Sequence, residues 1–246
     1  MGTLQVRRGL DRARSRTEWL DSRHSLAFGS HYDPENTCFG PLLAHNEDLL
    51  QPGPGYRPHL HRDVEILTWV LAGSLRHRDE TGESTLVAAG QLHHVSAGSG
   101  IRHTESSASE DLPVRLVQMW LSPDELGLAP SHRLLRVGER LETAELVLIA
   151  SGQVRADDPD VVRIRQPGAQ LSVARLPAGA TVTLPAAPYV HVFLASGSAT
   201  VQAPDGVTGQ QALVAGDALR ITDGGGERMS AGEPAELLVW QMHAGR

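Results

Sequence analysis

Two short stretches of the sequence carry side chains of the kind that bind metal ions. His59 and His61 lie two residues apart in the first stretch, and His103 and Glu105 have the same spacing in the second. Alternate residues of a β-strand point to the same face, so each stretch, if extended, presents two donor groups to one side. Two such strands facing each other would surround one point with four donors. The sequence therefore predicts a metal site made of His59, His61, His103 and Glu105.

This donor set suits a first-row transition metal, because neutral imidazole and carboxylate both bind such ions. The set resembles non-haem Fe(II) sites, which commonly use two histidines and one carboxylate, and it leaves room for water, O2 or a chelating substrate. We expect an open site in which Glu105 could loosen and act as a general base. The alternative is that these histidines are ordinary surface or core residues that never meet.

Other polar residues near these pairs have several possible roles. His93 and His94 are neighbours on one expected strand, so at most one of them faces the interior, where it would line the pocket or support a ligand. His77 lies between two arginines, and we expect it to be solvated. Asp63 and Glu65 follow the first pair and either lie on the surface or accept a proton from a ligand imidazole.

Short β-rich segments separated by turn residues surround both pairs. The segment 51–58 contains three prolines and two glycines, so it is predicted to be a loop. The expected strands span residues 24–28, 39–48, 64–71, 75–79, 86–88, 93–95 and 114–120. Strands at this spacing with glycine corners indicate a sandwich or a small barrel.

The same pattern returns in the second half of the chain. The stretch ending in Gly73-Ser74 is echoed by Gly197-Ser198, and the one ending in Gly90 is echoed at Gly216, which are offsets of 124 and 126 residues (197 − 73 and 216 − 90). Two echoes in the same order at nearly one offset indicate an internal repeat. We therefore predict one β-barrel unit used twice.

The offsets also predict that only the first unit carries chemistry. Added to the four ligand positions, they give residues without suitable donors, namely Thr183, Pro185, Met229 and Ala231. In the second unit, His191 is the histidine considered for a functional role, and we expect its role to be structural. The predicted division is a metal-binding domain at 1–130, a connection at 131–160 with strands near 146–150 and 161–164, and a second domain without metal ligands at 161–246.

Composition excludes several classes of function. The chain has 246 residues, 40% of them hydrophobic, which is enough for a large core. All 22 basic residues are arginines, so Schiff-base chemistry and a phosphate-loop lysine are excluded. The net charge of −7 argues against direct binding to nucleic acid, and the arginines near the N-terminus are expected to be a solvated edge.

The expected location is the cytoplasm, with no membrane partner. No apolar run approaches the roughly 18 residues of a membrane span, and no secretory signal follows the first charges. The only cysteine, Cys38, excludes an internal disulfide and suits a reducing compartment.

Several stretches of the first half resemble the pirin family, a branch of the cupin superfamily. They include PHLHRDVEI at 58–66, HRD at 77–79 and SAGSGIRHTE at 96–105, together with 19–26, 39–42 and 46–48. The resemblance covers residues 19–121 closely, whereas the second half is similar only in rhythm to the degenerate second cupin domain of the family. It implies an all-β bicupin, with two tandem cupin-type β-barrels (double-stranded β-helices) and few short helices.

The resemblance also implies a cofactor and an activity. One divalent metal, Fe(II) or another such as Ni, Zn, Mn, Co or Cu, would be held at the positions of His59, His61, His103 and Glu105. Bacterial members imply a quercetin 2,3-dioxygenase-like activity, with O2 and a flavonol-like or other small enolic substrate. We expect a monomer. Animal pirins imply the alternative of a metal- or redox-sensing regulator that binds a protein partner. A cupin acting on a different metabolite is a third hypothesis, because residues 90–95 depart from the family pattern at the pocket wall.

Overall fold

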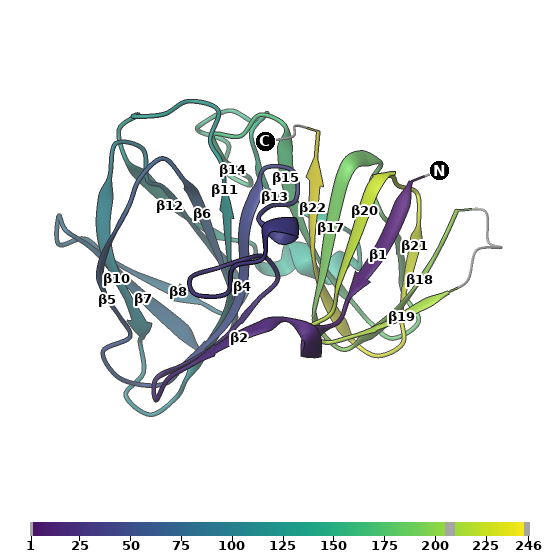
Figure 1. Ribbon diagram of the computed structural model, residues 1–246, viewed down its shortest axis with the longest axis horizontal. Helices are drawn as coiled ribbons and strands as arrows, with labels where there is room; N and C mark the ends of the chain where they lie inside the picture. Colours follow the sequence, from purple (N-terminus) through teal and green to yellow (C-terminus); the bar gives the residue numbers. More distant parts are fainter. Residues whose placement is uncertain (1, 205–209, 244–246) are drawn as a thin grey trace.

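The computed structural model describes residues 2–204 and 210–243 and consists of two β units side by side (Figure 1). The first unit contains the strands β2 (Ala13–Arg16), β3 (Leu20–His24), β4 (Leu42–Leu50), β5 (Tyr56–His61), β6 (Glu65–Ala72), β7 (Ser74–Asp79), β8 (Ser84–Ala88), β9 (Gln91–Ser96), β10 (Ile101–Ser107), β11 (Val114–Leu121) and β12 (Ser131–Arg136). They form a seven-stranded sheet, β12-β9-β6-β11-β4-β3-β2, and a four-stranded sheet, β5-β10-β7-β8. Leu75 and Val87 from the smaller sheet pack on Val70 and Leu116 from the larger one, so a hydrophobic core lies between the two sheets.

The second unit repeats this arrangement. Its strands are β13 (Val147–Ser151), β14 (Val162–Arg163), β15 (Ala169–Leu176), β16 (Thr181–Thr183), β17 (Ala187–Ser196), β18 (Ser198–Gln202), β19 (Gln211–Val214), β20 (Ala218–Gly224), β21 (Arg228–Ala231) and β22 (Ala235–Met242). The smaller sheet is β16-β21-β18-β19, and the larger is β1-β20-β17-β22-β15-β13-β14, which includes β1 (Thr3–Arg7) from the other end of the chain. Three short 3-10 helices complete the described elements, η1 (Gly9–Asp11), η2 (Pro34–Asn36) and η3 (Gly138–Thr143).

The predicted internal repeat is confirmed by strand order. The series β9-β6-β11-β4 of the first unit corresponds to β20-β17-β22-β15 of the second, and the smaller sheets match strand for strand. The matched glycines also share a backbone conformation, with φ +75° at Gly73 and +78° at Gly197, and +76° at Gly90 and +93° at Gly216. Glycine adopts such positive φ angles without steric cost, which explains why both pairs were visible in the sequence.

The second unit fills its centre with apolar side chains where the first unit has its predicted ligands. Met229 and Ala231 lie on β21, the counterpart of β10, and both belong to a buried hydrophobic cluster. Val182 on β16, the counterpart of β5, packs in the same cluster. The prediction of an all-β fold built from two related units is therefore confirmed, while the exact boundaries at residues 130 and 160 stay a prediction.

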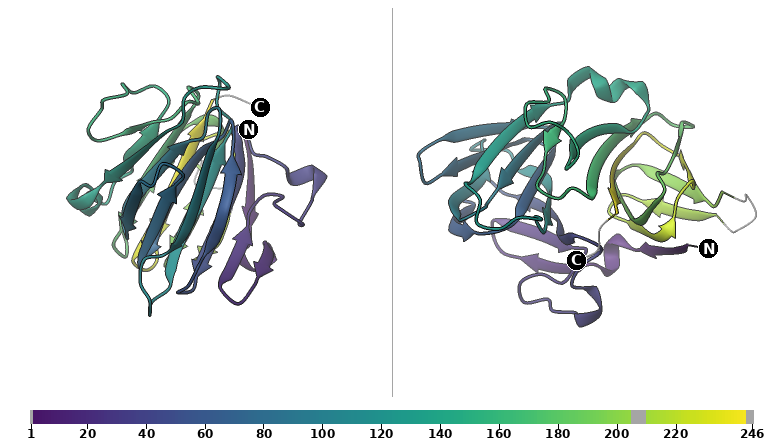
Figure 2. Two further views of the ribbon diagram at one scale, coloured as in Figure 1. Left: turned by 90° about the vertical axis from the view of Figure 1, so that its left-hand side faces the viewer. Right: turned by 90° about the horizontal axis from the view of Figure 1, so that it is seen from above.

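The two units are joined by a hydrophobic interface and by an exchanged strand. Trp69 and Met119 of the first large sheet pack in one buried cluster with Phe193 and Trp240 of the second. The N-terminal segment first pairs as β1 with β20 and then crosses to the first unit as β2 (Figure 2).

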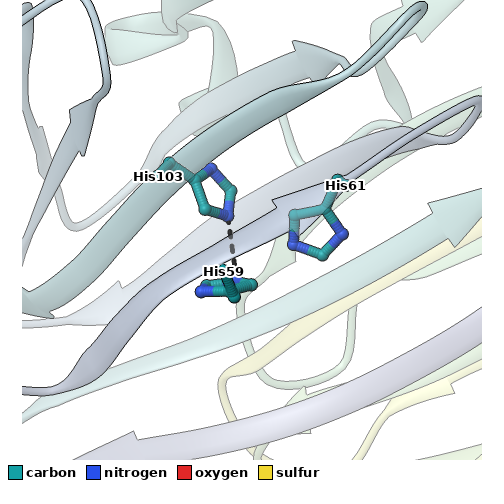
Figure 3. A group of neighbouring side chains, drawn as sticks. All are labelled: His59, His61 and His103. Carbon is teal, nitrogen blue, oxygen red and sulfur yellow. Dashed lines mark hydrogen bonds between the residues drawn. The ribbon is translucent and has the colours of Figure 1, made fainter.

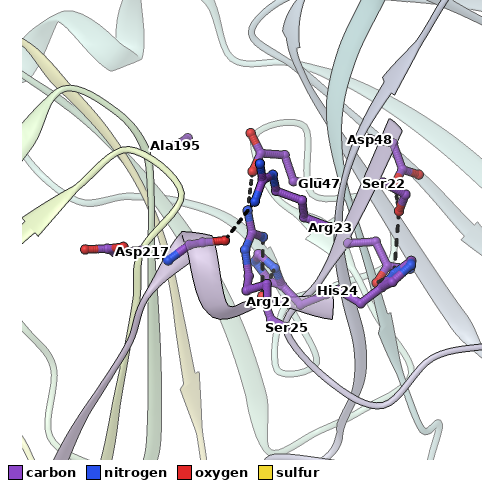
Figure 4. A network of polar contacts seen from close by, with 12 residues as sticks. Arg12, Ser22, Arg23, His24, Ser25, Glu47, Asp48, Ala195 and Asp217 are labelled. Carbon is purple, nitrogen blue, oxygen red and sulfur yellow. Dashed lines mark hydrogen bonds and ion pairs between the residues drawn. The ribbon is translucent and has the colours of Figure 1, made fainter. Parts of the chain in front are cut away.

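Ion pairs reinforce this junction (Figure 4). Arg12 and Arg115 both bind the carboxylate of Glu47, and Nη2 of Arg115 also donates to the carbonyl oxygen of Ala195, 2.8 Å away in the second unit. Asp217 of the second unit accepts from Arg8 at 2.7 Å. The crossing segment is thus held to both units by charged groups.

Some predicted boundaries are wrong for local reasons. The strand expected at 24–28 overlaps only the last residue of β3, which ends at His24. The loop expected at 51–58 ends earlier than predicted, because β5 begins at Tyr56. Pro58 is tolerated within β5 because this strand lies at the edge of its sheet, where a missing N–H breaks no ladder. The strand β12 and the helix η3 were not predicted in the connecting segment.

Candidate metal centre

Three of the four predicted ligands converge inside the first unit. The edge strand β5 pairs antiparallel with β10, and His59 lies directly opposite His103. Figure 3 shows His61 on the same strand as His59, with its ring turned toward the other two. One ring nitrogen of each histidine lies within 4.8 Å of the corresponding nitrogens of the other two. The spacing of the histidines in the sequence thus becomes a cluster of imidazole donors in space.

A hydrogen bond defines the tautomer of His59, the most exposed of the three histidines in the cluster. Nδ1 of His59 lies 2.8 Å from the carbonyl oxygen of Arg57, which can only accept, so Nδ1 carries a proton and the lone pair of the neutral ring lies on Nε2. That Nε2 lies 3.1 Å from Nε2 of His103. Two nitrogens bound at right angles to one ion, each about 2.1 Å from it, would be about 3 Å apart. The donors therefore fit a shared transition-metal ion.

Burial keeps the imidazoles of His61 and His103 neutral, which is the form that binds metals. Burial, and then the neighbouring histidines, lower the pKa of His61 to about 3. Burial and the nearby His59 likewise lower the pKa of His103 to about 4. Both side chains are thus ready to donate lone pairs at neutral pH.

Glu105 is buried beside the cluster. Within the described part of the chain, the group of donors within 4.8 Å of one another that contains these three histidines does not include Glu105. The carboxylate Oε2 of Glu105 accepts a hydrogen bond from Nε2 of Gln118 at 2.9 Å, and Oε1 of Gln118 accepts one from Nε1 of Trp120 at 3.0 Å. A β-bulge separates Glu105 from His103, so the register with β5 shifts between them. The role of Glu105 as fourth ligand and base stays a prediction.

The prediction that His77 is solvated is wrong. Its side chain is 2% exposed, and its Nε2 lies 2.7 Å from Nδ1 of His103. The strand β7 lies between β10 and β8, and alternation turns Arg76 and Arg78 outward and His77 inward. Flanking charges favour exposure, whereas the two-residue period of the strand is the signal that places His77 in the interior.

His93 and His94 point to opposite faces of β9, as predicted. The ring of His93 packs on His77 with 4.5 Å between centroids, so it is the one that faces the barrel interior. Nε2 of His94 lies 2.8 Å from Oε2 of Glu65 on the other face. Both histidines are nevertheless buried. His94 is buried because the segment before β15 covers that face, where the backbone N–H of Arg165 donates to the same oxygen of Glu65.

The two carboxylates considered as partners of the ligand histidines have other contacts. Although burial raises it, the pKa of Glu65 is lowered overall by the hydrogen bonds from His94, Ser96 and the backbone. Oδ1 of Asp63 accepts from the backbone N–H of Gly127 at 2.7 Å. Neither carboxylate is bonded to a ligand histidine in the described residues, and Glu65 is not a surface residue either.

His191 lies far from this cluster, at the junction of the two units. Its ring packs on that of His45, with 4.7 Å between centroids, and both side chains are fully buried. Burial holds the pKa of His191 well below its usual value. In the described residues its ring nitrogens have no hydrogen-bond partner, so this histidine is a neutral part of the core.

The fold and the histidine cluster together define the class of protein. Two related β-sandwich units in tandem, with a cluster of three histidines in the first of them, are the features of a bicupin with a candidate metal centre. Among the described residues, no helix is both long and apolar enough to cross a membrane.

Comparison with known proteins identifies the family. The pirin family model matches residues 7–121. A Mycobacterium tuberculosis protein, provisionally named as a quercetin 2,3-dioxygenase, is 45% identical over 242 residues, which cover 98% of this chain and 96% of that protein. The Escherichia coli quercetin 2,3-dioxygenase is 37% identical over 145 residues, or 59% of this chain and 62% of the enzyme.

A solved structure agrees with this assignment. The E. coli bacterial pirin YhhW, crystallised in complex with nickel(II), superposes with a TM-score of 0.86 at 29% identity, covering 98% of this chain and 100% of that one. This chain belongs to the pirin family, and the predicted bicupin fold is confirmed.

Proposed function

We propose that this protein is a metal-dependent dioxygenase that acts on flavonol-like or other small enolic substrates. The observation that carries the proposal is the convergence of three imidazoles, from His59, His61 and His103, on one point inside the first unit. The names of the two dioxygenase relatives support the reaction class. The nickel complex of the E. coli pirin supports a divalent metal in this fold.

In this proposal the three histidines and Glu105 hold the ion, Fe(II) in the first instance. When bound, the ion would supply a Lewis acid for the enolic oxygen of the substrate and the redox chemistry that O2 requires. Oε2 of Glu105 is held by Gln118, whereas its Oε1 has no hydrogen-bond partner among the described residues. We assign to Oε1 the removal of the proton from the enolic hydroxyl group. The ring of Trp120, 4.9 Å from that of His61, supplies an apolar wall.

The test is oxygen uptake together with loss of flavonol absorbance by iron-loaded protein. Glu105→Ala should lower turnover by about 10²- to 10⁴-fold, the usual contribution of a positioned base. Glu110→Ala, which removes an exposed carboxylate three residues after β10, should leave the rate unchanged. Metal content is measured for each variant, which separates loss of a ligand from loss of a base. Wild-type turnover no faster than that of Glu105→Ala would refute the proposal.

A further inference from the structure

A second polar site lies on the opposite side of β9 from the histidine cluster. It is a cavity of about 280 Å³ at the junction of β9, β12 and the segment that contains β14. Six polar residues on its wall matter here, namely His94, Ser131, His132, Arg133, Arg163 and Arg165. No aspartate or glutamate is among the described residues that line it. The cavity therefore concentrates positive charge in a protein whose net charge is −7.

Two of these arginines have no partner. Buried Val162 and Ile164 alternate with exposed Arg163 and Arg165, so the extended backbone turns both guanidinium groups to the same side. Neither group has a hydrogen bond or an ion pair with any described residue. Arginines usually pair with carboxylates, or bind carboxylate and phosphate ligands through their planar fork of donors.

The third arginine is fixed but not neutralised. Arg133 donates to the carbonyl oxygens of Val161, at 3.1 Å, and of Asp158, so its charge faces backbone dipoles and not a carboxylate. Both contacts anchor the segment that carries Arg163. A guanidinium group has five N–H donors, so Arg133 keeps donors for a ligand.

Two carboxylates near the cavity contact other groups. Glu65 lies behind His94 and accepts from that ring and from the backbone N–H of Arg165. Glu83 lies 3.1 Å from Nε2 of His132, so it contacts an imidazole and not a guanidinium group. The charges of Arg133, Arg163 and Arg165 are left for a ligand.

We propose that this cavity binds a small oxyanion, the phosphate or carboxylate group of a metabolite, through Arg163 and Arg165 with support from Arg133 and the hydroxyl group of Ser131. Its volume is close to the lower end of small-molecule sites, about 300 Å³, and exceeds the needs of a single phosphate group. The strand β12 belongs to the large sheet of the first unit and β14 to that of the second. A bound anion would therefore bridge the two units and stabilise the folded protein.

Calorimetric titration tests this proposal, with inorganic phosphate and succinate as separate probes in chloride buffer at constant ionic strength. Wild-type protein should show saturable binding of at least one probe. A charged hydrogen bond lost with each arginine should weaken that binding by about tenfold, so R163Q/R165Q should weaken it by about 100-fold. R136Q removes an exposed arginine at the end of the same strand β12 and should change nothing.

The two probes distinguish the source of the oxyanion. Arginine-dependent binding of phosphate alone assigns a phosphoryl ligand, and arginine-dependent binding of succinate alone assigns a carboxylate. The proposal is overturned if neither probe binds, if R163Q/R165Q binds as tightly as wild type, or if R136Q weakens binding equally. Both replaced arginines are exposed, so equal thermal unfolding of all three proteins without anion checks that each variant is folded.

Discussion

At the scale of the residue, His77 explains how one histidine of the cluster is oriented. Its Nε2 engages Nδ1 of His103 at 2.7 Å, which leaves Nε2 of His103 turned toward His59. The ring of His93 packs on the other side of His77 and limits its movement. Residues that bind the second nitrogen of a ligand histidine set its tautomer and ring orientation.

Replacing His77 should therefore weaken metal binding without removing a ligand. We expect His77→Leu to lower the affinity for Ni(II) by about 10- to 100-fold, the usual cost of losing such a partner. His77→Gln, which can still hydrogen bond to His103, should recover part of that loss. Competition with a chromophoric chelator measures both, and His31→Gln, outside the cluster, is the control. Unchanged affinity in His77→Leu would show that the contact with His103 does not orient the ring.

At the scale of the element, the bulged pair β5 and β10 sets the position of Glu105. Gly55 precedes β5 with φ +64°, and a Cβ atom there would lie 2.1 Å from the carbonyl oxygen of Glu105. The close approach of these two backbones is thus possible only with glycine. Gly29 has a similar φ of +57°, but a Cβ atom there would meet nothing within 4 Å.

This contrast separates backbone strain from steric overlap. Gly29→Ala should lower the free energy of unfolding by about 1 kcal/mol, the cost of a left-handed conformation. Gly55→Ala adds the overlap with Glu105 and should cost about 3 kcal/mol or more. Urea unfolding of both variants measures the difference. Equal losses would mean that the backbone at Gly55 relaxes freely and does not fix the bulge.

At the scale of the whole molecule, charged groups hold the crossing N-terminal segment between the two units. The side chain of Arg12 is 3% exposed, and its partner Glu47 is shared with Arg115. Removing one member of a buried ion pair leaves an uncompensated charge, which costs about 3 kcal/mol or more. The exposed pair of Arg14 and Asp21 has no such burial.

Glu47→Gln should therefore destabilise the protein by about 3 kcal/mol at pH 7, whereas Asp21→Asn should have little effect. Burial raises the pKa of Glu47, but Arg12 and Arg115 lower it further, so the folded value lies below the ordinary 4.5. The stabilisation is present above pH 4.5 and is lost as the pH falls through the folded pKa. Denaturant unfolding at pH 7 and below pH 4 should show a smaller acid-induced loss in Glu47→Gln. An equal loss in both proteins would argue against this role.

The features that the sequence revealed are those that local periodicity determines. His59, His61 and His103 were predicted because residues two apart in a strand share a face, whichever strand pairs with it. The repeat was visible because Gly73 and Gly197 occupy equivalent corners with a positive φ angle, which favours glycine. His77 was misplaced because its charged neighbours were given more weight than the alternation of its strand.

Other features depend on pairing between distant segments. The strand β1 pairs with β20, more than 200 residues further along the chain, and no local pattern in Thr3–Arg7 predicts that pairing. The arginine cavity likewise combines β9, β12 and the segment around Arg163. Such contacts follow from tertiary packing, which single-sequence patterns do not encode.

We propose that His59, His61 and His103, with Glu105, form a metal centre. Elemental analysis of protein purified without a histidine tag tests it most directly. We predict one divalent transition-metal ion per chain in the wild type and almost none in a His59→Ala/His61→Ala variant that remains folded. Wild-type protein that stays empty after incubation with Fe(II) or Ni(II), or a variant that retains the full metal content, would contradict it.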